Sequence, residues 1–381
     1  MGAYHQMGHN SQNLVKEVAG FVGAILSPIN YDQADMIDQV QDFAVRPAFD
    51  TIFDPQLYFP RSDMGQLRTW SYFPGDNFET ADADAKAWWD KLHDDVVGAA
   101  RTVEAKGIAS PIILPRQFDE NYYQRITGRY QDFATRASSA GLNPYQTLLV
   151  SPEDLSNHAR TMAVASLVTG TKAERVYLVV QSDLAPRFEY TDPEGIKGIM
   201  RLITLLSENR IETTVGFCSS DMVLWKFAGA AHCATGKFWN IRRFNRQRFE
   251  EPSDGGTQVG YWFEESLMAF IRQADIARLQ KVGILSQRSL NSPTCQAILA
   301  HMQTNPAKAW PKLGWLQFMD WFQETECLLG TGQYDLDRTL DAAEENWEKV
   351  EEAKILMDEK KNDGRWLRPW RQAILEYTQM P

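Results

Sequence analysis

YQTLLVSPED (145–154) and RVYLVVQSD (175–183) each begin with a run of apolar and β-branched residues and end on polar ones. Such runs are typical of strands that are buried on both faces of a parallel sheet. The second run is followed by DPEGIKGIMRLITLLSENR (192–210), where apolar residues recur at helical spacing behind an Asp-Pro start. These segments therefore predict parallel strands connected by helices.

The same pattern recurs along most of the chain. Six further apolar runs with polar or proline-containing ends are GAILSPIN (23–30), TIFDPQ (51–56), SPIILPRQ (110–117), TTVGFCSSD (213–221), AHCATGK (231–237) and VGYWFEES (259–266). Eight strands alternating with helices predict a closed (β/α)8 barrel, and an open doubly wound sheet is the alternative. Helical patterns then replace the strands, so we expect a barrel over 1–262 and a helical C-terminal extension over 263–381.

Composition narrows the class of protein. The chain has 381 residues and a formal net charge of −11, which argues against a general nucleic-acid coat protein. No apolar run is long enough for a membrane span, and the N-terminus lacks the basic and apolar regions of a secretory signal. The 4 cysteines form no CxxC pair, so we interpret them as reduced thiols in a cytoplasmic protein. His5 and His9 are interpreted as part of a mobile N-terminal tail.

The carboxyl ends of the predicted strands nominate catalytic residues, because barrel enzymes carry their chemistry there. Asp54, Asp183 and Asp221 follow three of the strands and are candidates for a general acid, a general base or a nucleophile. The alternative is structural. Asp54 precedes a proline and would shape a turn, and Asp221 would cap the following helix.

One basic segment stands out in this acidic chain. CATGKFWNIRRFNRQRF (233–249) contains no acid and follows the seventh predicted strand, where barrels frequently bind phosphate. Arginine suits bidentate phosphate recognition, and interleaved aromatic residues suit a stacked base. The alternative is that the arginines pair with the protein's own acids while Phe238 and Trp239 pack in the core. The predicted phosphate ligands are Gly236, Lys237, Arg242, Arg243 and, at the end of an earlier strand, Arg116.

Metal and cofactor sites are not expected. Cys218, His232 and Cys233 lie near one another, but neighbouring residues of a strand point to opposite faces and cannot easily share one ion. The chain also lacks a GxGxxG fingerprint, a P-loop and a Ser-centred elbow, so no nucleotide cofactor is implied.

Three segments resemble the tRNA-guanine transglycosylase family of barrels: FDPQLYFPRS (53–62), VYLVVQSD (176–183) and VGFCSSDMVLWKFAGAAHCATGKFWNIRRF (215–244). Members of that family exchange a guanine in nucleic acid, using one aspartate as nucleophile and another near the base. The family's Gly-Gly-Phe-Gln run, its nucleophile and its zinc motif have no counterpart in this chain. The resemblance therefore transfers no catalytic residue, but it implies an RNA, DNA or nucleotide ligand.

We therefore expect a barrel enzyme that acts on a phosphate-bearing substrate, preferably a nucleotide or nucleic acid, with base or glycosyl transfer as the reaction class. A small phosphometabolite is an alternative substrate. A second alternative is a non-catalytic barrel that joins a protein partner or a second copy through its helical, Trp-rich C-terminal region.

Overall fold

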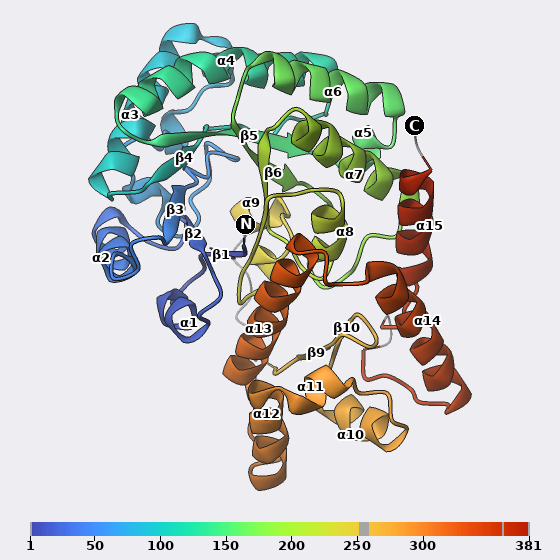
Figure 1. Cartoon of the computed structure of the whole chain (residues 1–381). Helices are drawn as coiled ribbons and strands as arrows, with labels where there is room; N and C mark the ends of the chain where they lie inside the picture. The colour runs from blue at the N-terminus through green and yellow to red at the C-terminus, as the bar shows by residue number, and fades with distance from the viewer. Residues whose placement is uncertain (1, 251–258, 360–361, 380–381) are drawn as a thin grey trace.

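The strands close into a barrel. A computed structural model describes residues 2–250, 259–359 and 362–379 (Figure 1). Within these residues, parallel strands are hydrogen-bonded in chain order, and β1 pairs with both β2 and β8 to complete the ring. The predicted (β/α)8 barrel is thereby confirmed. The strands are β1 (Tyr4–Gln6), β2 (Gly23–Leu26), β3 (Asp50–Phe53), β4 (Gly107–Ala109), β5 (Asn143–Val150), β6 (Arg175–Val180), β7 (Glu212–Gly216) and β8 (His232–Thr235).

Helices connect the strands and surround the barrel (Figure 1). Their starts follow the chemistry of the sequence: Asp192 caps α7 by accepting hydrogen bonds from two backbone N–H groups, and Pro193 takes the first helical position. These helices are α1 (Gln12–Glu17), α2 (Gln33–Phe43), α3 (Lys86–Thr102), α4 (Glu120–Ser139), α5 (Pro152–Leu155), α6 (His158–Gly170), α7 (Pro193–Glu208) and α8 (Met222–Phe227).

The N-terminal segment corrects one expectation. The sequence predicts a mobile tail around His5, yet this segment forms β1 and His5 is fully buried, with its ring edge-on to Phe21 at 5.4 Å. Tyr4 fixes the strand by donating a hydrogen bond of 2.7 Å to Asp50. His9 is exposed just beyond the strand. A strand of 3 residues is too short to show a period in the sequence.

The run at 259–266 corrects another expectation. The sequence predicts the last barrel strand here, but β9 (Trp262–Glu264) pairs antiparallel with β10 (Ala269–Ile271) outside the barrel. The strand predicted at 110–117 also lies elsewhere, since β4 spans Gly107–Ala109 and ends before that run begins. The strand counted as seventh in the sequence is therefore β8, and the basic segment follows the last strand of the barrel.

The C-terminal region packs against the barrel through α13 and α15, which contact α8 and α7 (Figure 1). Lys226 of α8 and Glu326 of α13 form an ion pair of 2.7 Å whose side chains are 2% and 1% exposed. Trp370 of α15 donates a hydrogen bond of 3.0 Å to the carbonyl of Tyr190. These buried contacts fix the two parts together. The helices are α10 (Gln273–Lys281), α11 (Gln287–Asn291), α12 (Pro293–Thr304), α13 (Pro311–Gly330), α14 (Leu336–Glu352) and α15 (Leu367–Thr378).

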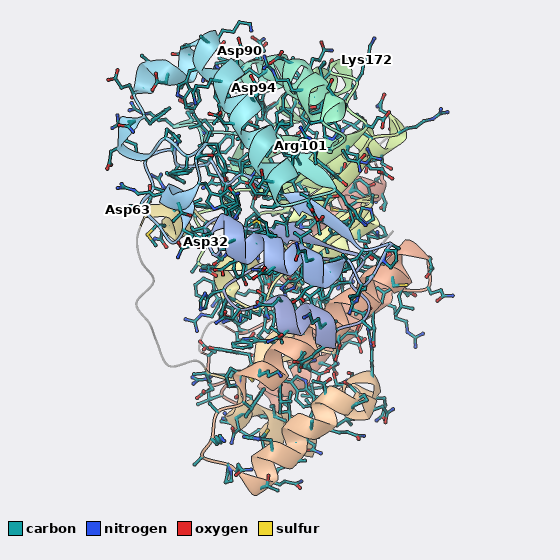
Figure 2. The ribbon with its side chains drawn as sticks, turned by 90° about the vertical axis from the view of Figure 1, so that its left-hand side faces the viewer. Asp32, Asp63, Asp90, Asp94, Arg101 and Lys172 are labelled. Carbon is teal, nitrogen blue, oxygen red and sulfur yellow. The ribbon has the colours of Figure 1, made fainter. Side chains whose placement is uncertain are left out.

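The acidic surplus of the chain is partly carried by the outer helices. Figure 2 shows Asp90 and Asp94 projecting from α3, and Asp32 at the start of α2. Asp94 forms an ion pair of 2.6 Å with Arg136, and Asp32 caps its own helix. These acids therefore have their partners on the outer helices.

Candidate anion-binding site

The basic segment crosses the carboxyl end of the barrel. Beyond β8 the chain forms a short 3-10 helix (Trp239–Ile241) and then α9 (Gln247–Glu250). Phe244 bridges to Gln181 after β6, and its ring contacts Tyr58 beyond β3 and Phe217 beyond β7. Strands β3 and β7 lie on opposite sides of the barrel, so residues 244–249, which we call the cap, cover its mouth.

One arginine of the segment belongs to a buried ion network. Arg243 is 1% exposed and contacts Glu189 at 2.9 Å and Asp221 at 3.4 Å, while its guanidinium stacks over Tyr190 at 4.1 Å. Burial raises the pKa of both carboxylates, and the charge of Arg243 opposes that shift. For Arg243 the contacts match the alternative in which the arginines pair with the protein's own acids.

Two further cations of the segment, Lys237 and Arg242, have no acidic partner in the part of the chain that the structure describes. Among the described residues, no carboxylate forms an ion pair with Lys237 or Arg242, which are 6% and 3% exposed. Lys237 donates to the carbonyl of Asn10 at 2.9 Å, and Arg242 donates to the carbonyl of Gly236 at 2.7 Å. Burial lowers the pKa of Lys237 to about 8 and also lowers that of Arg242. Backbone carbonyls and aromatic faces contact both cations, but within the described ranges no carboxylate pairs with them, so a negative charge is what their surroundings lack.

Lys237 and Arg242 line a cavity of about 360 Å³ between the barrel and the C-terminal region. Arg187 and Arg272 also line it, but these two are paired with Glu359 at 3.3 Å and Asp358 at 2.9 Å. The walls are aromatic: Phe238, Trp239, Tyr261 and Trp315. We call this the cationic cavity.

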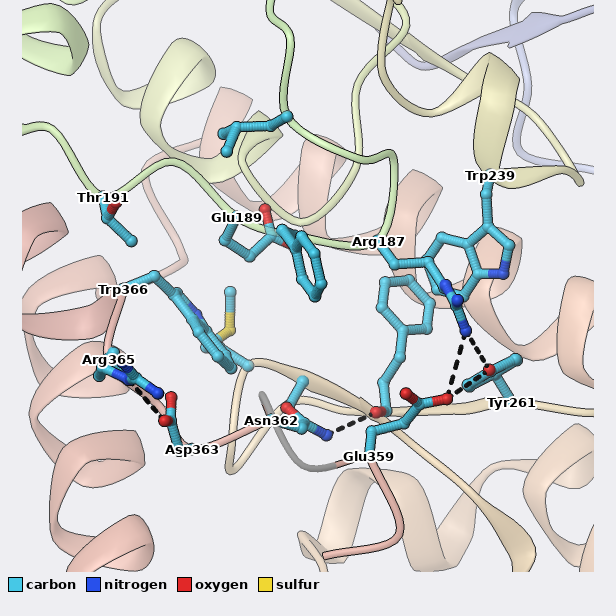
Figure 3. A pocket seen from close by; sticks show the side chains of 15 residues that line it. Arg187, Glu189, Thr191, Trp239, Tyr261, Glu359, Asn362, Asp363, Arg365 and Trp366 are labelled. Atoms are coloured by element: carbon cyan, nitrogen blue, oxygen red, sulfur yellow. Dashed lines mark hydrogen bonds and ion pairs between the residues drawn. The ribbon is translucent and has the colours of Figure 1, made fainter.

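A second cavity of about 470 Å³ adjoins the first (Figure 3). Arg187, Trp239, Tyr261 and Glu359 line both, so the two form one groove. The second cavity has mostly apolar walls, and we call it the aromatic cavity. Its apolar lining residues are Leu184, Phe188, Trp239, Met268, Ala269, Phe270 and Trp366.

The candidate catalytic aspartates lie apart from the groove. Asp54 is buried below the cap and accepts hydrogen bonds of 3.0 Å from the Gln56 backbone and the Tyr58 hydroxyl. Burial raises the pKa of Asp54 to about 7. Asp221 is held by Arg243, and Asp183 is exposed and accepts a hydrogen bond from Gln181. None of the three lines either cavity.

The candidate phosphate ligands also lie in different places. Lys237 and Arg242 lie together at the groove, whereas Arg243 is turned into the ion network. Gly236 packs against β1, where a Cβ atom would lie 2.6 Å from the carbonyl oxygen of Gln6. Arg116 is exposed in the segment after β4.

The sequence did not nominate Arg187, Arg272 or Glu359, which also line the groove. They come from the loop after β6, from the residue before α10 and from the segment after α14. No local pattern marks them, because only the packing of the C-terminal region on the barrel brings them together.

Within the described ranges, no group of three or more His, Cys, Asp and Glu side chains could hold a metal ion. Cys218 and Cys233 are buried, and the Nδ1 atom of His232 contacts the backbone of Gly2. In the part of the chain that the structure describes, no helix is both long and apolar enough to cross a bilayer.

Comparison with known proteins gives no family for this chain. No family model and no curated protein matches it. Among solved structures, an L-ribulose 3-epimerase has 10% identity and a TM-score of 0.37 over 92% of this chain and 97% of its own. A GH18 chitinase from Pseudoalteromonas aurantia has 11% identity and a TM-score of 0.40 over 63% of this chain and 95% of its own. An AP endonuclease, family 2, from Brucella melitensis has 11% identity and a TM-score of 0.36 over 65% and 96%. Likeness at this level says nothing about activity, and the barrel assignment rests on the strand order.

Proposed function

We propose that this chain is a barrel enzyme whose substrate carries a phosphate, and that the groove between the barrel and the C-terminal region binds that substrate. The observation that supports this function is the pair of desolvated cations, Lys237 and Arg242, which lack a carboxylate partner among the described residues and line the cationic cavity. A phosphate group would supply the negative charge that this pair lacks.

A nucleotide fits the groove better than a small phosphosugar. The adjoining aromatic cavity offers Trp239, Phe270 and Trp366 to a flat ring. Stacking on aromatic side chains binds bases with little dependence on their identity. The resemblance to the tRNA-guanine transglycosylase family points to the same class of ligand. We place the phosphate in the cationic cavity and the base in the aromatic cavity.

Acid–base chemistry on such a substrate requires a carboxylate at the groove. The carboxylates that line it are Glu189, Glu359 and Asp363, and not the aspartates nominated from the sequence. Glu189 joins the aromatic cavity to the buried network of Arg243. We therefore transfer the candidate catalytic role from Asp54, Asp183 and Asp221 to Glu189, with base or glycosyl transfer as the proposed reaction class.

Calorimetric titration with adenosine 5′-monophosphate and with pyrophosphate tests the binding site. Lys237→Ala and Arg242→Gln should each weaken both ligands by roughly 10-fold or more, because each removes a charge-assisted contact. Arg246→Gln is the matched control. Arg246 lies in the same segment but is exposed and pairs with Glu250 at 2.8 Å, so its loss should leave binding unchanged.

If neither ligand binds to the wild-type protein, or if the three variants behave alike, the proposed site is wrong. The salt dependence of binding separates free nucleotides from nucleic acid. A strand that contacts several phosphates loses affinity steeply with added salt, whereas a mononucleotide shows a shallow slope.

A further inference from the structure

We infer that Glu359 is the residue that recognises the sugar of the ligand, so that the groove selects ribonucleotides over their deoxy counterparts. This inference rests on the proposed nucleotide site and adds the substrate class. Glu359 lines the cationic cavity and the aromatic cavity alike, which places it between the positions of the phosphate and the base (Figure 3). In a nucleotide, the sugar occupies that position.

The contacts of Glu359 leave one oxygen available. Its Oε1 atom accepts hydrogen bonds from Arg187 at 3.3 Å and from the Tyr261 hydroxyl at 2.8 Å. Within the described ranges, no hydrogen bond reaches Oε2. Arg187 and Tyr261 therefore orient the carboxylate, and its second oxygen has no donor among the described residues (Figure 3).

A fixed carboxylate suits a sugar hydroxyl. An ionised carboxylate only accepts hydrogen bonds, and a hydroxyl is a donor that carries no charge to neutralise. In dinucleotide-binding folds an acidic side chain reads the ribose hydroxyls in this manner. Towards a phosphate the same carboxylate is repulsive. Glu359 is the one carboxylate among the described residues that line the cationic cavity, so it should oppose the anion while it favours the sugar.

These opposite effects make the assignment testable. The probes are adenosine 5′-monophosphate, its 2′-deoxy and 3′-deoxy forms, and pyrophosphate, which has no sugar. For the wild-type protein, removal of the recognised hydroxyl should weaken binding by about 10-fold or more, because a charge-assisted hydrogen bond is lost. In Glu359→Gln the preference for the ribonucleotide should fall to roughly 2-fold, since a neutral acceptor holds a hydroxyl less strongly. Pyrophosphate should bind to this variant as well as before or more tightly.

Glu250→Gln provides the matched control. Glu250 lines neither cavity, forms an ion pair of 2.8 Å with Arg246, and has a side chain that is 36% exposed, close to the 35% of Glu359. Its substitution removes the same charge beside the basic segment and should leave the sugar preference unchanged.

Equal affinity of the wild-type protein for all three nucleotides overturns the inference, and so does a full sugar preference in Glu359→Gln. If Glu359→Gln weakens pyrophosphate together with the nucleotides, Glu359 only supports the shape of the groove. The wild-type comparison tests the sugar preference without any variant, and Glu359→Gln then tests whether Glu359 is the residue that reads the sugar. Failure of both pyrophosphate and adenosine 5′-monophosphate to bind would instead refute the proposed function.

Discussion

Arg242 and Arg243 are adjacent in the chain, yet their surroundings are opposite. Arg243 lies between Glu189 and Asp221, and its charge is compensated inside the protein. Among the described residues, Arg242 contacts backbone carbonyls and the faces of aromatic rings, with its guanidinium 3.9 Å from the ring centre of Phe318. Removal of a cation that is paired with buried acids leaves those acids without a partner, whereas a buried cation without acids is where we propose that an anion binds. Two neighbouring residues of one segment thus differ in role: Arg243 belongs to the buried ion network, and Arg242 belongs to the proposed anion-binding site.

The largest expected effect on stability comes from the loss of Arg243, the arginine that is paired with acids. Arg243→Met should lower the free energy of unfolding by about 3–5 kcal/mol, because it leaves two buried carboxylates without their cation. Arg242→Met should change it by no more than about 1 kcal/mol, since only cation–π and carbonyl contacts are lost. Urea denaturation of both variants measures the difference. Equal losses would mean that Arg242 is structural too.

The stabilisation that a bound ligand provides tests Lys237 and Arg242, which have no acidic partner among the described residues. Pyrophosphate at about 100 times its Kd should raise the free energy of unfolding of the wild-type protein by about 2.7 kcal/mol. Lys237→Ala and Arg242→Met should lose most of that gain at the same concentration. Thermal unfolding with and without pyrophosphate measures it, and Asp363→Asn serves as the variant that should keep the gain. A gain retained without Lys237 would place the anion elsewhere.

The pKa of Lys237 predicts two trends of opposite sign with pH. Burial lowers this pKa from 10.5 to about 8, so between these values the unfolded chain holds a proton that the folded protein has released. The contribution of Lys237 to stability therefore rises as the pH increases from about 8. Over the same range the affinity for sulfate, which stays fully ionised, should fall because the ammonium charge is lost. Lys237→Met should flatten both profiles, and unchanged profiles would show that Lys237 does not titrate there.

The smallest expected effect is that of an exposed arginine in the same segment. Arg246 is exposed and pairs with Glu250 within α9. Arg246→Gln should change the free energy of unfolding by less than about 0.5 kcal/mol and leave anion affinity unaltered, since exposed pairs contribute little. Denaturation and calorimetry on one preparation measure both quantities. A large change in either would show that the cap depends on this pair.

Much of the fold was predictable from the sequence, because β5 and β6 contain uninterrupted apolar runs at 148–150 and 176–180. The ends of the barrel were not. Strand β1 alternates tyrosine, histidine and glutamine over 3 residues, so it lacks an apolar signature. The run around β9 has such a signature, but its partner is the neighbouring β10 and not the barrel. Composition indicates that a segment is extended and does not indicate what it pairs with.

The site was predictable only in part, for a similar reason. The excess of cations after the last strand nominated Lys237 and Arg242, which both line the cationic cavity, while their role as phosphate ligands stays a prediction. Which arginine meets the acids depends on the turn at 239–241, and Arg187 and Glu359 come from distant segments. The tryptophans of the C-terminal region suggested a partner surface, yet Trp310, Trp321, Trp347, Trp366 and Trp370 are buried within the chain.

The cap over the barrel mouth also bears on how such a protein can diversify. With Phe244 packed across the axis, the groove lies at the seam with the C-terminal region, and each side supplies part of its lining. Substitutions in the segments around Tyr261, Glu359 and Trp366 should therefore alter the lining of the groove while the barrel strands stay unchanged. The shape of the groove and the stability of the barrel can then vary separately.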